Sequence, residues 1–261
     1  MVPGSERIVY RGSTGDHPLE VSGEGSLLSL RFGGDERQSC VDIDCPHKLQ
    51  LAYTRWMMTA LLLHPAPSRF LLCGLGGGAI AHFLHHHHPD GQQDIVEKEA
   101  KVIRVAKKYF GLPQTEQITL YHQDAVDFIC NHPPNTAYHI AFIDLFSQDA
   151  MAPPVYVADF YRGIFDLLDA QGVIAVNLWN GNTELFQNCL HAIRKSCANR
   201  VMELAVKKRS NAIVFGFRDN DPRQVIKKAR KQLPALEARY QLPFHKYFKK
   251  LRRTNRRNLF A

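Results

Sequence analysis

The sequence predicts an α/β fold built on a mostly parallel sheet, and three features of the chain carry that prediction. Apolar, strand-like runs alternate with helix-length segments from residue 69 to residue 197, as in successive βαβ units. A glycine-rich segment, Gly74 to Ala79, lies between the first of these strands and the helix that follows it. Two further β-rich runs, 201–206 and 212–217, leave no room for a helix between them, so we expect them to form an antiparallel hairpin.

The first 45 residues are expected to form a small separate β-region. They are rich in Gly and Ser, and they contain short alternating stretches at 7–10 and 27–32, which are typical of a hairpin or meander. A helix is expected over 46–63, ending before Pro65. The predicted domains are therefore this region (1–45), a nucleotide-binding α/β domain (46–233) and a basic tail (234–261).

Within the central domain each strand is expected to be followed by a helix. The predicted strands are 69–73, 94–97, 117–121, 138–144 and 172–178, and the predicted helices are 76–88, 100–110, 124–130, 155–168 and 182–197. A parallel sheet that closes with an antiparallel last strand is the Rossmann-like layout of class I S-adenosylmethionine-dependent methyltransferases. The closing hairpin disfavours a nicotinamide-dependent dehydrogenase, which has the ordinary dinucleotide-binding sheet.

Composition excludes several classes of protein. Of 261 residues 45% are apolar and 22% charged, as in soluble globular proteins. No window approaches the roughly 18 apolar residues that cross a bilayer, and residues 1–11 lack the apolar run of a secretory signal. The six cysteines form no Cys-x-x-Cys pair and several lie in apolar runs. We therefore expect a cytoplasmic protein with buried thiols, no disulfides and no metal site.

Charge is unevenly distributed along the chain. The net charge is +8, but residues 218–261 contain fourteen Lys and Arg against three acidic residues, which leaves the other 217 residues at −3. Aromatic residues are interleaved with the cations at Tyr240, Phe244, Tyr247 and Phe248, a combination that can hold nucleic acid phosphates and bases. The alternative is a basic surface helix followed by a disordered end.

The glycine-rich segment predicts a nucleotide-binding loop. Gly74, Gly76, Gly77 and Gly78 allow a tight turn between strand and helix, and they let a ligand approach the backbone closely. The spacing Gly74-x-Gly76-x-x-Ala79 also satisfies the dehydrogenase fingerprint. A tight turn that binds no ligand is the structural alternative.

Two carboxylates at neighbouring strand ends extend this prediction. Glu97 ends the second strand, 23 residues after Gly74, where a carboxylate can accept hydrogen bonds from both ribose hydroxyls. Asp124 and Ala125 begin the helix after the third strand. The aspartate can accept from an adenine amino group while the alanine leaves room for the ring. A solvated glutamate and a plain helix N-cap are the respective alternatives.

Over residues 38–179 the chain resembles the spermidine synthase family, the polyamine aminopropyltransferases. The similarity lies in the glycine loop and in segments 95–99, 102–110, 123–125 and 142–144, together with the small β-region that precedes them. The resemblance implies that Glu97 binds ribose, that Asp124 binds adenine and that Asp144 is the catalytic aspartate. It also implies an amine acceptor, S-adenosylmethionine or its decarboxylated form as co-substrate, and a homodimer.

The chemistry of aminopropyl transfer requires a group such as Asp144. A neutral amine must attack a carbon next to a sulfonium, and a carboxylate can accept the proton that is released. Tyr53 is expected to assist. The acceptor side departs from the family pattern, because Ser147 occupies the place of a second aspartate, Asp149 is displaced by two residues, and Arg55 lies in the preceding helix.

These departures keep two other functions open. One is a methyltransferase, acting on RNA that the basic tail guides to the site. The other is a protein that binds the nucleotide without catalysing a reaction. Finally, His82 and His85 to His88 are expected to form a surface patch, because five histidines on a short helical end cannot converge on one metal ion.

Overall fold

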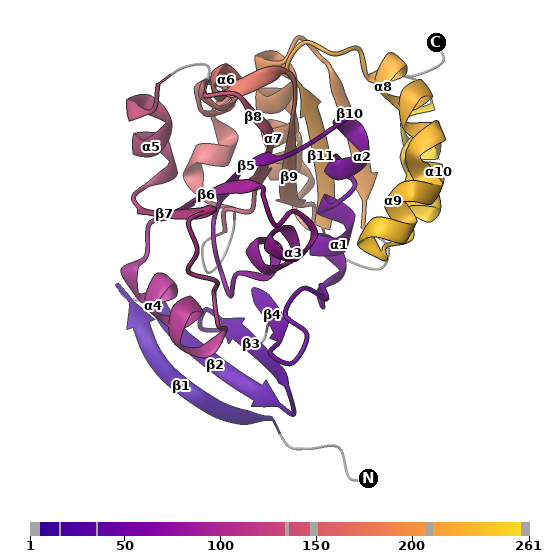
Figure 1. Ribbon diagram of the computed structural model, residues 1–261. Helices are drawn as coiled ribbons and strands as arrows, with labels where there is room; N and C mark the ends of the chain where they lie inside the picture. Colours follow the sequence, from indigo (N-terminus) through magenta and orange to yellow (C-terminus); the bar gives the residue numbers. More distant parts are fainter. Residues whose placement is uncertain are drawn as a thin grey trace.

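The computed structural model describes residues 6–15, 17–34, 36–133, 136–146, 151–206 and 211–256. Two sheets organise this part of the chain (Figure 1): a four-stranded antiparallel sheet at the N-terminus and a seven-stranded central sheet. Both were expected from the sequence.

The N-terminal sheet is a meander. Its strands are β1 (Arg7–Thr14), β2 (His17–Glu24), β3 (Leu27–Arg31) and β4 (Ser39–Asp42), and each pairs antiparallel with the next. Leu19, Val21 and Leu30 are buried, so one face of the meander joins the main core. Tyr10 of β1 packs on Tyr109 of α4 (Ala100–Tyr109) with ring centroids 5.4 Å apart.

The central sheet has the topology predicted from the sequence. Its strands are β5 (Arg69–Cys73), β6 (Gln92–Glu97), β7 (Ile118–His122), β8 (Tyr138–Ile143), β9 (Leu168–Trp179), β10 (Val201–Ala205) and β11 (Asn211–Phe217). They lie in the order β10-β11-β9-β8-β5-β6-β7. The pairs among β5 to β9 are parallel, whereas β11 runs antiparallel to both β9 and β10.

Helices cover both faces of this sheet. One core joins it to α1 (Ala52–Met57), α2 (Ala60–Leu63), α3 (Ala79–His87) and α4, and the other joins it to α5 (Ala125–Asn131), α6 (Ala158–Leu167) and α7 (Thr183–Ser196). Successive side chains of β11 point into opposite cores: Ile213 and Phe215 belong to the first core and Val214 to the second. None of the helices in the described ranges is long and apolar enough to span a membrane.

Three predicted helices begin later than expected. The helix expected from residue 155 begins at Ala158, after a 3₁₀ turn over Pro153–Tyr156. The helix expected from residue 46 begins at Ala52, because residues 42–48 form two turns instead, closed by Cys45 N to Asp42 O and Lys48 N to Cys45 O. The helix expected from residue 76 begins at Ala79. Gly76 and Gly78 have φ of +53° and +79°, a conformation that a right-handed helix excludes.

The C-terminal segment folds onto the sheet edge formed by β10. It consists of α8 (Pro222–Ala229), a 3₁₀ turn (Arg230–Gln232), α9 (Leu233–Tyr240) and α10 (Phe244–Thr254), which lie together along one side of the molecule (Figure 1). Its aromatic residues are part of the core: Tyr240, Phe244, Tyr247 and Phe248 are at most 6% exposed. The sequence left open whether these rings are available to bases or belong to a basic surface helix, and their burial rules out the first alternative.

The histidine-rich segment is not the surface patch that we expected. His82 and His88 are buried, and of the five histidines only His86 is exposed. His82 Nε2 donates to Phe110 O at 2.9 Å, and His88 Nε2 lies 2.9 Å from the Tyr240 hydroxyl. These histidines join α3 to α4 and to α9.

All six cysteines are free thiols, as predicted. Cys40, Cys73, Cys189 and Cys197 are buried, and burial raises the pKa of the Cys73 and Cys189 thiols to about 12. The prediction of burial is wrong for Cys130, which is exposed at the end of α5, and Cys45 is half-buried.

Candidate active site

A pocket of about 440 Å³ lies at the carboxyl ends of β5, β6 and β8, where the N-terminal sheet closes over them. The central sheet and the segments that follow its strands supply most of its lining. The N-terminal region adds Thr14, His17, Phe32 and Gln38. The small β-region is therefore one wall of the site.

The glycine loop is shaped by packing as well as by the needs of a ligand. Gly74 and Gly76 line the pocket, and Gly74 has a φ of +97°. A Cβ at Gly74 would lie 2.4 Å from the Asp144 carbonyl oxygen, so no larger residue fits there. Gly77 and Gly78 are outside the described pocket lining, and Gly78, in the left-handed conformation, precedes α3.

Glu97 ties the loop to the end of β6. One carboxylate oxygen accepts from Leu75 N at 3.0 Å and the other from Glu99 N at 2.9 Å. Burial raises the pKa of Glu97, although these two backbone donors oppose the shift. Each carboxylate oxygen has two acceptor directions, so Glu97 keeps capacity for ligand hydroxyls while it holds the loop.

Asp124 combines a structural role with a place in the pocket. It is the N-cap of α5, and its Oδ1 accepts from Val126 N at 2.8 Å. Its side chain also lines the pocket, next to Ala125, which is 7% exposed. The cap engages one oxygen and leaves the other for a donor in the pocket.

Asp144, at the end of β8, is the centre of a hydrogen-bonded network. Asn177 Nδ2 of β9 donates to Asp144 Oδ1 at 2.9 Å, and Asn211 Nδ2 of β11 donates to Asn177 Oδ1 at 3.1 Å. The Tyr53 hydroxyl donates to Gln38 O at 2.9 Å and lies near the Asp144 carboxylate, which raises the Tyr53 pKa further beyond the effect of burial.

The pKa of Asp144 is raised above its ordinary value. Burial is the largest cause, and the hydrogen bond from Asn177 and the nearby Tyr53 hydroxyl lower the pKa in opposition. The structure thus brings together Asp144 and Tyr53, as expected from the sequence. A raised pKa makes the carboxylate a better proton acceptor than an exposed aspartate.

The sequence reasoning missed several residues of the site. Asn177 carries a recognisable signal, because it is a polar residue inside the apolar run of a buried strand. His17 and Gln38 carry none, since they lie in a region that has no nucleotide-binding pattern. Ser147 and Asp149 lie outside the described residues, and Arg55 is not part of the described pocket lining.

The described lining of the pocket is acidic. It contains four carboxylates, Glu97, Glu99, Asp124 and Asp144, and its basic residues are Lys98 and His17. A pocket with this excess of carboxylates concentrates cationic ligands and disfavours anionic ones.

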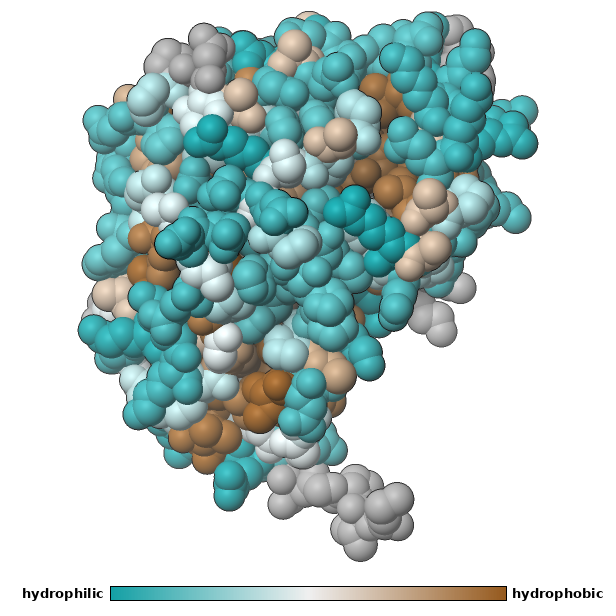
Figure 2. All heavy atoms as spheres, viewed as in Figure 1, coloured by the Kyte–Doolittle hydropathy of each residue, from teal (hydrophilic) through white to brown (hydrophobic). Residues whose placement is uncertain are grey.

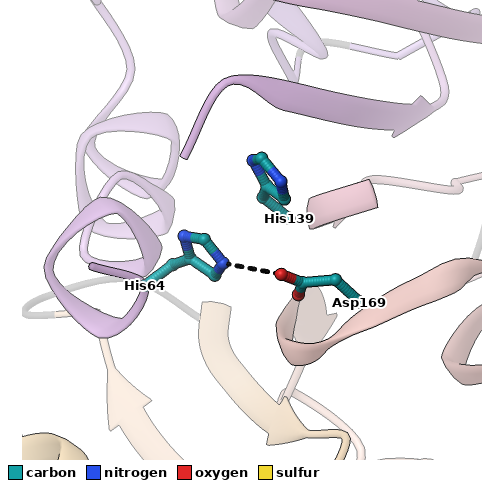
Figure 3. A group of neighbouring side chains, drawn as sticks. All are labelled: His64, His139 and Asp169. Atoms are coloured by element: carbon teal, nitrogen blue, oxygen red, sulfur yellow. Dashed lines mark hydrogen bonds and ion pairs between the residues drawn. The ribbon is translucent and has the colours of Figure 1, made fainter. Parts of the chain in front are cut away.

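A second group of polar side chains lies at the opposite, amino-terminal edge of the sheet. His64 follows α2, His139 is in β8 and Asp169 is in β9 (Figure 3). Backbone N–H groups of Ala66 and Ser68 donate to Nδ1 of His64 and His139, at 3.3 and 2.9 Å.

These donors decide the role of the group. A neutral imidazole whose Nδ1 accepts a hydrogen bond carries its proton on Nε2. His64 Nε2 accordingly donates to Asp169 Oδ2 at 3.4 Å. The His64 nitrogen that faces the carboxylate is thus a donor, which is the arrangement of a hydrogen-bonded cluster and not of a metal ligand.

Comparison with known proteins identifies the family. The model of the spermine/spermidine synthase domain matches residues 50–210. A polyamine aminopropyltransferase of Neisseria meningitidis is 30% identical over 97% of this chain and 95% of its own length. The chain belongs to the spermine/spermidine synthase family.

Solved structures share the fold. A probable spermidine synthase from Corynebacterium glutamicum has a TM-score of 0.72 at 16% identity, over 86% of each chain. Human Methyltransferase-like protein 13 in complex with SAH has a TM-score of 0.58 at 23% identity, over 75% of this chain and 91% of that one. The predicted Rossmann-like methyltransferase fold is therefore confirmed.

Proposed function

We propose that this protein is an aminopropyltransferase that moves the aminopropyl group of decarboxylated S-adenosylmethionine to an amine. The observation that carries the proposal is the acidic pocket at the strand ends, with the hydrogen-bonded Asp144 in its lining. Both the donor and the protonated form of the acceptor are cations, and this pocket offers them four carboxylates. The family to which the chain belongs supports the same reaction.

In this proposal the nucleotide is held by the loop and by the two strand-end carboxylates. Glu97 accepts from the ribose hydroxyls, and Asp124 accepts from the adenine amino group beside Ala125. Gly74 and Gly76 admit the ligand close to the backbone, while Gly77 and Gly78 set the shape of the loop. Backbone N–H groups already hold both oxygens of Glu97 and one oxygen of Asp124, so little reorganisation is needed on binding.

Asp144 is the proposed proton acceptor. The neutral amine attacks the carbon next to the sulfonium, so a C–N bond forms while the C–S bond breaks. The sulfonium leaves as a neutral thioether, methylthioadenosine, and the proton of the new ammonium passes to Asp144. Tyr53 and Asn177 hold the carboxylate in place.

The choice of donor follows from the charge of the pocket. S-adenosylmethionine carries a carboxylate that needs a cationic or N–H partner, whereas the decarboxylated form does not. In the described lining the one lysine, Lys98, follows Glu97 at the end of β6, on the ribose side. Methyl transfer from S-adenosylmethionine remains the second candidate, and the structural likeness to human Methyltransferase-like protein 13 favours it.

The test is a calorimetric titration with S-adenosylmethionine, its decarboxylated form and methylthioadenosine, followed by turnover with a panel of diamines and polyamines. We expect the decarboxylated donor and methylthioadenosine to bind at least tenfold more tightly than S-adenosylmethionine. The opposite preference, together with methylation of an acceptor, would establish the second candidate. Binding without turnover of any acceptor would mean a nucleotide-binding protein that does not catalyse the reaction.

We further propose a homodimer in the cytoplasm that uses no metal. Ile8 and Ile43, in and next to the N-terminal sheet, are 42% and 45% exposed, and such aliphatic side chains favour contact with a second copy. The six free thiols suit a reducing compartment. Light scattering after size-exclusion chromatography measures the mass, and dialysis against EDTA should leave turnover unchanged.

A further inference from the structure

The three C-terminal helices present a basic surface that is separate from the pocket. We define this surface, the basic edge, by exposed side chains of α8, the 3₁₀ turn, α10 and the residues that directly follow α10: Lys227, Lys228, Arg230, Lys231, Lys246, Lys249, Arg253 and Arg256. Between residues 222 and 256 the acidic residue is Glu237, whose carboxylate is paired with His245. No described residue of these helices lines the pocket.

Packing determines which side chains this edge exposes. Phe244, Tyr247, Phe248 and Leu251 of α10 are buried, so the opposite side of the helix points to solvent. Lys246, Lys249 and Arg253 lie on that side, at spacings of three and four residues. Over seven residues an α-helix rises roughly 10 Å, so these three cations form a fixed row and not a flexible tail. Figure 2 shows hydrophilic side chains along this outer edge.

The same packing limits the kind of partner. Proteins that prefer single strands stack bases on exposed aromatic rings, and Tyr240, Phe244, Tyr247 and Phe248 are buried. Helices that bind membranes insert an apolar face, and the apolar face of α10 is covered by the sheet through β10 and by Trp56, whose ring lies 4.4 Å from that of Tyr247. What remains exposed on α10 is a row of cations, of which Lys246 lies over the buried Trp56 ring with its Nζ 6.0 Å from the ring centroid.

We propose that the basic edge binds the phosphate backbone of a nucleic acid duplex without reading its sequence. A duplex carries about one negative charge per 1.7 Å of its axis, the highest linear charge density among the partners considered. The row on α10 spans about three base-pair steps at 3.4 Å each, and α8 carries two further exposed cations, Lys227 and Lys228. The proposal rests on the charge and packing of these helices and is independent of the reaction in the pocket.

The experiment is fluorescence anisotropy of the full chain with a labelled 20-base-pair duplex, as RNA and as DNA, between 50 and 200 mM KCl. Three phosphate contacts at a slope of −0.9 each predict a loss of affinity of about 40-fold over this range. The variant Lys249→Glu/Arg253→Glu should have a salt slope shallower by about 2. RNA and DNA duplexes should bind alike, and an unpaired strand of the same length should bind more weakly.

The matched control is Arg104→Glu/Lys107→Glu, which changes the net charge by the same amount on the exposed side of α4. It should keep the wild-type slope. Both variants should keep the wild-type unfolding temperature within a few degrees, and both should keep the turnover of the pocket. The turnover measurement separates failure of the duplex-binding proposal from failure of the proposed aminopropyl transfer.

Three results would overturn the proposal. The first is equal weakening in both variants, which would mean a general charge effect. The second is tighter binding to the single strand than to the duplex, which would mean base stacking at another site. The third is binding to vesicles of anionic lipid with none to either duplex. If the charge-reversed variant unfolds, Lys249→Gln/Arg253→Gln replaces it. Its salt slope should also be shallower by about 2, because the same two phosphate contacts are lost.

Discussion

Replacing Asp144 by asparagine should abolish turnover and, at the same time, stabilise the protein. The two side chains have the same shape. In the wild-type structure Asn177 Nδ2 donates to Asp144 Oδ1 at 2.9 Å, and the carboxamide oxygen of an asparagine at this position can accept the same hydrogen bond. The packing of the site is thus preserved while the proton acceptor is lost. Loss of a general base lowers rates by about 10²- to 10⁴-fold, or about 3 to 5 kcal/mol of transition-state stabilisation.

The effect on stability follows from the sign of the pKa shift. Burial raises the pKa of Asp144 above its unfolded value, so the folded protein binds this proton more readily than the unfolded chain does. Stability is therefore lost as the pH rises from the pKa of Asp144 in the unfolded chain toward its pKa in the folded protein. At neutral pH the buried carboxylate destabilises the fold, and Asp144→Asn removes that cost.

The assay is the formation of methylthioadenosine under saturating donor and acceptor, combined with thermal unfolding at pH 7.5 and calorimetry of nucleotide binding. The control is Asp127→Asn, an exposed carboxylate on the neighbouring helix α5, which should leave all three readouts unchanged. Turnover of Asp144→Asn within tenfold of wild type would refute its role as the base. A lower unfolding temperature would refute the assigned cause of the pKa shift.

Three further predictions concern the surroundings of the site. Asn177→Ala should lower kcat about tenfold and move the acidic limb of the pH–rate profile upward, because the hydrogen bond that it loses lowers the pKa of Asp144; nucleotide affinity should not change. Gly74→Ala should lower the free energy of unfolding in urea by about 3 kcal/mol or more, since the added Cβ would meet the Asp144 carbonyl oxygen. The control, Gly111→Ala, has a φ of +63° and no neighbour within 4 Å of the added Cβ, so it should lower the free energy of unfolding by only about 1 kcal/mol. Burial lowers the pKa of His88 to about 4 from an ordinary value of 6.5, so the stability that depends on neutral His88 is complete above pH 6.5 and falls by about 2 kcal/mol by pH 5. Other histidines, such as His87, add to the loss in acid, and in pH-dependent calorimetry His88→Gln should lose less stability than the wild type by about that 2 kcal/mol.

The parts of the fold that were predictable are those set by local pattern. Apolar runs of strand length and amphipathic helices recur along the chain, so the alternation from residue 69 to residue 197 and the closing hairpin were predicted correctly. The start of α3 was not, because it depends on positive φ at Gly76 and Gly78. Glycine permits that conformation but does not reveal in the sequence which glycines adopt it.

The candidate site was predictable only as far as the strand ends that carry it. Glu97, Asp124 and Asp144 each follow an identifiable strand, and parallel strands bring such residues to one edge of the sheet. Asn177 depends on register: β8 and β9 pair with Ile143 opposite Val176, which places the next residues, Asp144 and Asn177, side by side. A register between strands more than thirty residues apart is not contained in either strand alone.

The histidines and the C-terminal aromatics were misjudged for a common reason. His88 is satisfied by Tyr240, a residue 152 positions away, and no local window contains both. Such residues were therefore assigned to the surface, although His82, His88 and Tyr240 have hydrogen-bond partners in the interior. The same contacts explain why the charge difference along the chain becomes a difference in space: burial of Tyr240 and of the aromatic face of α10 turns the lysines and arginines outward along β10. The carboxylates, in contrast, meet at the strand ends around the pocket. The cationic substrate and the nucleic acid duplex that we propose would thereby bind to separate surfaces, and neither would have to approach the charges that repel it.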